Sequence, residues 1–163
     1  MSFETAYEAT IRREGGYVLH QVKGDRGGMT YAGIARAAHA DWIGWNDIDR
    51  GDTPATALVR NFYRVQFWDA IKGDSLAEPM AEALFDAAVN MGVKTALKLA
   101  QIVVGASPDG VLGKRTMVAL QGIESETFRM RFALARIARY TEIGKDNQLR
   151  FLRGWIRRAL EVA

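Results

Sequence analysis

Three oxygen-bearing side chains near the N-terminus have the types and spacing that acid–base chemistry requires. Glu14 lies where a helical pattern gives way to two glycines, and Asp25 and Thr30 follow it in a turn-rich segment. Glycoside hydrolysis needs one carboxylic acid that protonates the leaving oxygen and a second group that holds water or stabilises the developing charge. A helix–loop–hairpin path can fold these three side chains around one cleft, so a glycosidase is one interpretation.

Each of these residues also has a purely structural explanation. Glu14 can be a solvated glutamate at a helix end, although a carboxylate is unfavourable there because the C-terminal end of the helix dipole is negative. Asp25 opens the run Asp25-Arg26-Gly27-Gly28, whose composition is that of a turn. Spacing by itself leaves both explanations open.

Four further side chains are candidates for substrate binding. Tyr17, His20 and Tyr31 belong to the same N-terminal segment, and the faces of sugars pack on aromatic rings. Asn90 ends a helical pattern, where its amide can face a sugar or cap the helix. For each of the four a structural role stays open.

The elements that position these residues can be read from periodicity. A helix should start after a Ser2 cap and stop at Gly15-Gly16, because consecutive glycines disfavour a helix interior. Its apolar residues recur every four positions at Phe3, Tyr7 and Ile11. The β-prone and turn-forming residues of 17–34 predict a hairpin or small irregular lobe.

The remainder of the chain is predicted to be helical. Thr53-Pro54 should open a helix that runs to about Phe67, and Glu78-Pro79 should open another. Other helices are expected from about residue 35 and over 94–104, 115–120, 125–140 and 147–160. The large aromatic residues expected in the core are Trp42, Trp45, Phe62, Phe67 and Trp68. The predicted architecture is mainly α with a small β-hairpin lobe near the N-terminus.

Composition limits the classes of function. The chain has 163 residues, no cysteine and two histidines. The length suits one domain, and the absence of cysteine excludes a disulfide scaffold, a thiolate nucleophile and thiolate zinc sites. We therefore expect neither a metal nor a cofactor. The N-terminus does not resemble a signal peptide, which predicts synthesis in the cytoplasm.

The charge is unevenly distributed. The formal net charge is +3, but residues 128–163 contribute +6 and residues 1–127 contribute −3. The last predicted helix has an apolar face that includes Leu152, Ile156 and Leu160. Its basic side is formed by Arg150, Arg153, Arg157 and Arg158. Such a helix can pack on a core with a solvated basic side, or bind an anionic envelope or membrane surface.

A nucleic-acid partner is not expected. The first 127 residues are acidic on balance, and the sequence contains no motif of a known DNA-reading module.

An ordered set of segments resembles glycoside hydrolase family 108, whose members are N-acetylmuramidases found as phage endolysins and secretion-activator proteins. The resemblance covers nearly the whole chain. Its segments are REGGY (13–17), DRGGMT (25–30), GI (33–34), WD (68–69), FDAAVN (85–90), DGVLGKRT (109–116) and FLRGWIRR (151–158).

This resemblance implies a lysozyme-like fold that cleaves the β-1,4 bond between N-acetylmuramic acid and N-acetylglucosamine. Glu14 would be the general acid, and Asp25 and Thr30 would complete the constellation of phage-type lysozymes. Residues 1–163 would form one domain, with a catalytic part over 1–92 and a helical peptidoglycan-binding part over 93–163. The expected protein is a monomer that acts on glycan strands after holin-dependent or similar release.

Two other functions remain open on the sequence. A lytic transglycosylase uses a single glutamate and leaves a 1,6-anhydro product instead of a reducing sugar. A non-catalytic peptidoglycan-binding or secretion-accessory protein would keep the fold without cleaving the wall.

Overall fold

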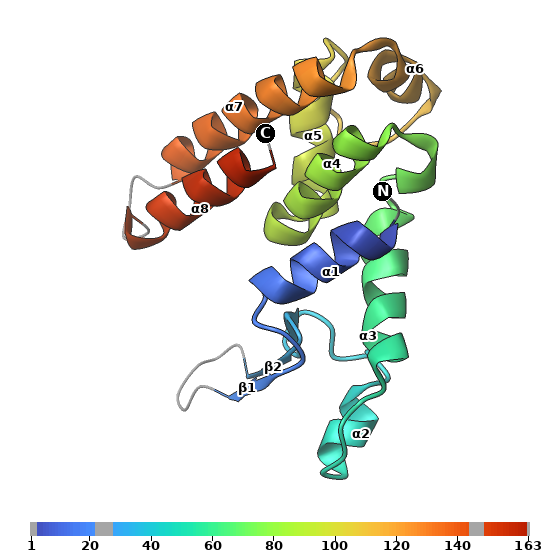
Figure 1. Cartoon of the computed structure of the whole chain (residues 1–163), viewed down its shortest axis with the longest axis vertical. Coiled ribbons are helices and arrows are strands. Elements are labelled where there is room, and N and C mark those ends of the chain that lie inside the picture. The colour runs from blue at the N-terminus through green and yellow to red at the C-terminus, as the bar shows by residue number, and fades with distance from the viewer. Residues whose placement is uncertain (1–2, 22–27, 144–148, 163) are drawn as a thin grey trace. The chain divides into compact units, whose positions relative to one another are not determined.

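The computed structural model describes residues 3–21, 28–143 and 149–162, which form two compact units (Figure 1). The N-terminal unit spans Phe3–Gln66 and the C-terminal unit begins at Phe67. This boundary separates two compact bodies and lies earlier in the chain than the predicted boundary between functional parts at residues 92 and 93. The functional division stays a prediction.

The N-terminal unit opens with the predicted helix, α1 (Phe3–Arg13). Its apolar face is buried through Phe3, Tyr7 and Ile11, which are 2%, 4% and 6% exposed. After the helix, Gly15 and Gly16 adopt positive φ of +90° and +82°, a backbone region that side-chain-bearing residues avoid. The two glycines therefore end α1 and turn the chain toward the sheet.

The predicted hairpin is an antiparallel sheet of three short strands in chain order. The strands are β1 (Leu19–Gln21), β2 (Met29–Tyr31) and β3 (Ile34–Ala35). Thr30 in β2 is paired with both His20 in β1 and Ala35 in β3. The expected helix near residue 35 is wrong, because Ala35 is held in the sheet by this pairing and turns follow it.

Two helices complete this unit, α2 (Trp45–Asp49) and α3 (Thr56–Tyr63), and a π-helical turn follows over Arg64–Trp68. The predicted start at Thr53 is wrong. The cap and the first helical residue are Ala55 and Thr56 instead of Thr53 and Pro54, a shift of two residues, because Ala55 is still non-helical at ψ 136°.

Aromatic residues form the core of the N-terminal unit. The Trp42 ring contacts those of Tyr31, Trp45 and Phe62, at centroid distances of 6.1, 5.2 and 6.3 Å. The prediction that Trp42, Trp45, Phe62 and Trp68 are buried is confirmed. Phe67 is only half-buried, so its assignment to the core is wrong.

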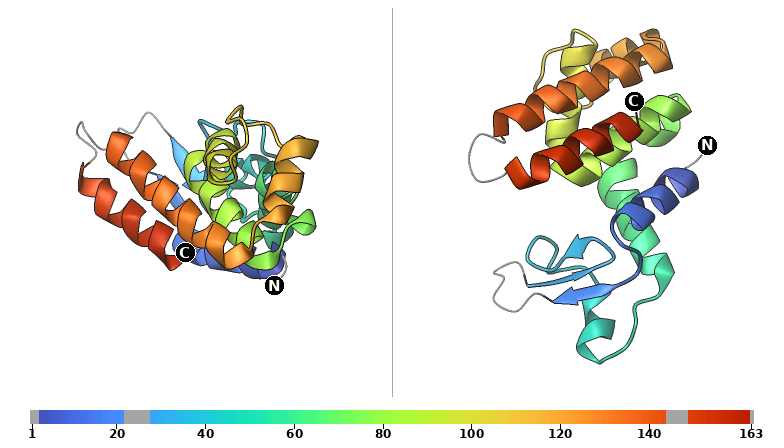
Figure 2. Two further views of the ribbon diagram at one scale, coloured as in Figure 1. Left: turned by 90° about the horizontal axis from the view of Figure 1, so that it is seen from above. Right: turned by 60° about the vertical axis from the view of Figure 1, so that its left-hand side comes forward.

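All the secondary-structure elements in the described part of the C-terminal unit are helices. Its helices are α4 (Glu78–Met91), α5 (Val93–Val103), α6 (Lys114–Gly122), α7 (Ser125–Ile143) and α8 (Leu149–Glu161). Helix α4 packs against α5 and α7, and α7 runs beside α8 (Figures 1 and 2). The prediction of a mainly α protein with a small β element near the N-terminus is confirmed.

The last helix differs from its prediction at two positions. Arg158 turns inward, where its Nε donates a hydrogen bond to Asp86 on α4 at 3.0 Å and its side chain is only 17% exposed. Leu160, predicted on the apolar face, is 58% exposed, whereas Ala159 and Val162 are buried. This orientation of α8 pairs Arg158 with the buried Asp86 carboxylate.

The predicted basic surface of α8 is therefore smaller than the sequence indicates. Arg153 and Arg157 are exposed, Arg158 is paired inside the unit, and the Arg150 side chain lies outside the described residues. Within the described ranges, no helix has the length and apolar character needed to span a membrane.

Candidate active site

Glu14 lies directly after the last residue of α1, and its N–H donates to the Thr10 carbonyl at 2.9 Å. Its side chain is half-buried and lies against the turn between β2 and β3. A Cβ added at Gly33 in that turn would lie 2.9 Å from Glu14 Cγ and 3.1 Å from Glu14 Cβ. The sheet therefore sets the path of the Glu14 side chain, and only a glycine leaves room for it.

The turn that contacts Glu14 is held from α3. Tyr63 is buried and its hydroxyl donates a hydrogen bond to the Ala32 carbonyl at 2.9 Å. Ala32 and Gly33 both have positive φ, at +48° and +80°. The sequence interpretation did not single out Tyr63, although the apolar spacing of Val59, Phe62 and Tyr63 marks the inner face of α3.

His20 and Thr30 lie opposite each other on β1 and β2. Directly paired residues of an antiparallel ladder place their side chains on the same face of the sheet. A Cβ added at Gly15 would lie 3.9 Å from His20 Nε2, so the imidazole lies beside the residue that follows Glu14. The structure thus brings Glu14 and His20 into one region and places Thr30 across the ladder from His20. Asp25 lies outside the described residues.

The two candidate tyrosines differ in exposure. Tyr17 is 40% exposed, and its hydroxyl shares a hydrogen bond of 2.9 Å with the hydroxyl of Tyr7. Tyr31 is 3% exposed, stacks on Trp42, and has a hydroxyl with no hydrogen-bond partner among the described residues. Burial raises the pKa of Tyr31, so this hydroxyl keeps its proton. Tyr17 is the one of the two that is open to a ligand.

Asn90 lies on α4 in the C-terminal unit and accepts a hydrogen bond from the Tyr140 hydroxyl at 2.5 Å. One turn earlier on the same helix, Asp86 accepts hydrogen bonds from Arg136 at 2.8 Å and Arg158 at 3.0 Å. Asn90 therefore belongs to a polar cluster that joins α4, α7 and α8. Its predicted contact with a sugar stays a prediction.

The chemistry that the N-terminal unit offers comes from a half-buried carboxyl, a threonine hydroxyl and an imidazole. In ranges 3–21, 28–143 and 149–162, no three His, Asp or Glu side chains gather in a way that could hold a metal ion. A carboxyl at the edge of a small sheet, with its path fixed by backbone, is suited to delivering a proton to a bound substrate.

Comparisons with known proteins identify the family of the chain. Residues 7–92 match the family model described as glycosyl hydrolase 108, and residues 95–160 match the model described as a predicted peptidoglycan domain. Glu14, His20 and Thr30 all lie inside the first match. No curated protein matches the chain.

A solved structure is similar along nearly the whole length. SagA from Brucella abortus is 27% identical in sequence and superimposes with a TM-score of 0.78. The similarity covers 98% of this chain and 90% of that one. The predicted lysozyme-like fold class is confirmed by this likeness.

Proposed function

Because the chain belongs to glycosyl hydrolase family 108, we propose that it hydrolyses the β-1,4 bond between N-acetylmuramic acid and N-acetylglucosamine. The two matched models indicate a glycoside hydrolase that acts on peptidoglycan.

The observation that carries the proposal is the position of Glu14. Its side chain follows the end of α1, and its Cβ and Cγ lie against the Gly33 turn. A general acid must be held within hydrogen-bond reach of the oxygen that it protonates, and a rigid backbone contact supplies this constraint. Glu14 is accordingly the proton donor to the glycosidic oxygen.

The other site residues take supporting roles in the same proposal. As Glu14 protonates the leaving oxygen and the glycosidic bond breaks, positive charge develops on the muramic acid ring. Thr30 and Asp25 hold the attacking water or stabilise that charge. Water adds to the anomeric carbon and its proton is released, which leaves a reducing N-acetylmuramic acid. Tyr17 and His20 border the bound glycan.

We place this activity in an endolysin, released from the cytoplasm of a bacterial host onto the wall. Support comes from the ordered segments that resemble glycoside hydrolase family 108, which includes phage endolysins. Purified protein added to outer-membrane-permeabilised Gram-negative cells should lower their turbidity. Cells that stay turbid while isolated peptidoglycan is cleaved would contradict the lytic role and leave the hydrolase assignment intact.

Product analysis tests the proposed reaction. Mass spectrometry of digested peptidoglycan should find muropeptides that end in reducing N-acetylmuramic acid, and Glu14→Gln should abolish them. A 1,6-anhydro product would identify a lytic transglycosylase instead. Binding to sacculi without any soluble product would identify a non-catalytic wall-binding protein.

A further inference from the structure

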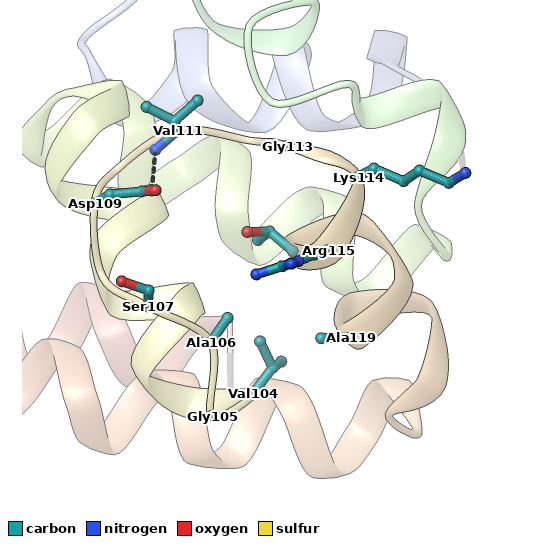
Figure 3. Close-up of a pocket in the computed structure, with 11 residues that line it drawn as sticks. Val104, Gly105, Ala106, Ser107, Asp109, Val111, Gly113, Lys114, Arg115 and Ala119 are labelled. Atoms are coloured by element: carbon teal, nitrogen blue, oxygen red, sulfur yellow. Dashed lines mark hydrogen bonds between the residues drawn. The ribbon is translucent and has the colours of Figure 1, made fainter.

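The C-terminal unit contains a cavity of about 570 Å³ that is separate from the residues around Glu14 (Figure 3). It lies between the loop that follows α5 and the first residues of α6. All the residues that line it fall within the match to the peptidoglycan model. Its volume is within the range of cavities that hold small ligands.

Part of the cavity wall is apolar and made of small side chains. Val104, Ala106, Val111 and Ala119 line it, and none of its lining residues is aromatic. Sugar-binding sites usually present an aromatic face to the ring of the sugar. This wall is instead suited to small aliphatic groups such as methyls.

Arg115 supplies a cation to the cavity. Its guanidinium points into the hollow between the loop and α6, whereas the side chain of the neighbouring Lys114 points away (Figure 3). Arg115 is exposed and has no hydrogen bond or ion pair with the described part of the chain. An arginine in this state is available to a carboxylate, which it can bind through two parallel hydrogen bonds.

Asp109 gives the cavity an anionic side as well. Its Oδ1 accepts hydrogen bonds of 2.8 Å from the Val111 N–H and from Gln101. These two hydrogen bonds hold the pKa of Asp109 below its ordinary value, so the carboxylate is ionised at neutral pH. The cavity therefore presents charges of both signs beside an apolar wall.

The loop that forms the cavity is held by a buried glutamine. Gln101 is 1% exposed, and its Nε2 lies 3.0 Å from the Val111 carbonyl and 3.1 Å from Thr116 Oγ1. Its Oε1 accepts from the Gly110 N–H at 2.8 Å. A cavity held in this way is preorganised, so a ligand loses less free energy to ordering when it binds.

We propose that this cavity binds the peptide stem of peptidoglycan, with a stem carboxylate on Arg115 and the methyl groups of alanine residues on the apolar wall. An amino group of the stem faces Asp109. Peptidoglycan as the target rests on the proposed function; the choice of the peptide over the glycan rests on the charges and the non-aromatic wall. The cavity would hold the enzyme on peptide-bearing wall while Glu14 acts on the glycan.

Calorimetric titration of the full chain with the synthetic stem L-Ala-γ-D-Glu-meso-diaminopimelyl-D-Ala-D-Ala tests this proposal. Arg115→Gln should weaken binding about 10- to 100-fold, the typical effect of losing a charge-assisted hydrogen bond. Arg131→Gln is the matched control, because it removes an exposed cation on α7 that does not line the cavity, and it should change affinity less than about twofold. Ala119→Leu should weaken binding by filling the cavity without changing any charge.

Two results would overturn the proposal. One is an equal affinity of Arg115→Gln and wild type for the stem, and the other is that wild type does not bind the stem. Chitotetraose, a glycan without peptide, should show no Arg115-dependent binding, and an affinity that falls in Arg115→Gln would make the cavity a sugar site instead. The stem contains no glycosidic bond, so its binding is independent of hydrolysis. Stem binding by a chain that fails to cleave peptidoglycan would refute the proposed reaction alone.

Discussion

Two carboxylates of this protein have different surroundings. Asp86 lies inside α4, is 1% exposed, and accepts hydrogen bonds from Arg136 and Arg158. Glu14 lies just past the end of α1, is half-buried, and contacts a turn that contains a positive-φ glycine. One carboxylate is enclosed by cations from two other helices, and the other lies at an edge where a substrate can reach it.

The comparison teaches that burial, more than residue type, separates a structural acid from a candidate catalytic one. Both residues occur in segments that resemble the same enzyme family. Asp86 joins three helices into one body. Glu14 has its side chain directed by backbone, which is the constraint that proton transfer needs.

The largest expected effect on stability is that of Asp86→Asn. Removing this charge leaves the fully buried Arg136 without its counterion, and breaking a buried pair typically costs about 3–5 kcal/mol. Urea unfolding of the full chain measures the change. Glu142→Gln, which breaks an exposed ion pair with Arg139 on α7, should cost less than about 1 kcal/mol.

Equal losses from Asp86→Asn and Glu142→Gln would contradict the structural role of the Asp86 cluster. They would show that the two arginines find other partners when the carboxylate is lost.

A smaller effect is expected at the turn beside Glu14. In Gly33→Ala the new Cβ would lie 2.5 Å from the Tyr63 hydroxyl and 2.9 Å from Glu14 Cγ, so the turn or the glutamate must move. Hydrolysis of peptidoglycan should fall about tenfold or more, since misplacement of a reacting group is costly. The free energy of unfolding should fall by about 1–3 kcal/mol.

Gly51→Ala is the control for backbone strain in the same unit. Gly51 has a φ of +84°, close to that of Gly33, but a Cβ there would meet nothing within 4 Å. It should lose stability and keep the wild-type rate of hydrolysis. If both variants slow hydrolysis equally, the contact between Gly33 and Glu14 does not position the acid.

The smallest effects on stability are expected from replacing one tyrosine by phenylalanine in each unit. Tyr63→Phe removes the hydrogen bond to Ala32, and Tyr140→Phe removes the one to Asn90. Each should cost about 1 kcal/mol on thermal unfolding. Tyr63→Phe should also slow hydrolysis a few-fold, because the turn against Glu14 loses its anchor.

Kinetics of Tyr140→Phe report on Asn90. The amide loses the donor that fixes it, so a role of Asn90 in substrate binding would appear as a raised KM. An unchanged rate for Tyr63→Phe would contradict the positioning role of Tyr63.

Much of the fold follows from local sequence signals. The glycines after α1 and the proline near the start of α4 act through their own backbone preferences, so the ends of these helices were predictable. The position of Glu14 at the end of α1 was predictable for the same reason.

The rest depends on contacts between residues far apart in the chain. Arg158 was predicted on the solvent side of α8, but its partner Asp86 lies on another helix that no periodicity reveals. Tyr63 was missed because its hydrogen bond reaches a turn in the sheet. The cavity beside Arg115 could not be predicted either, because its loop is held by hydrogen bonds from Gln101 on α5.

The most direct test of the central claim is the rate at which Glu14→Gln releases reducing ends from purified peptidoglycan. Glu8→Gln is the matched control, because Glu8 is an exposed glutamate on the same helix. The account predicts that Glu14→Gln loses about 100-fold or more of the rate, the typical contribution of a general acid, while unfolding like wild type. Glu8→Gln should keep the wild-type rate. A Glu14→Gln variant that retains more than a few per cent of wild-type activity would contradict the account.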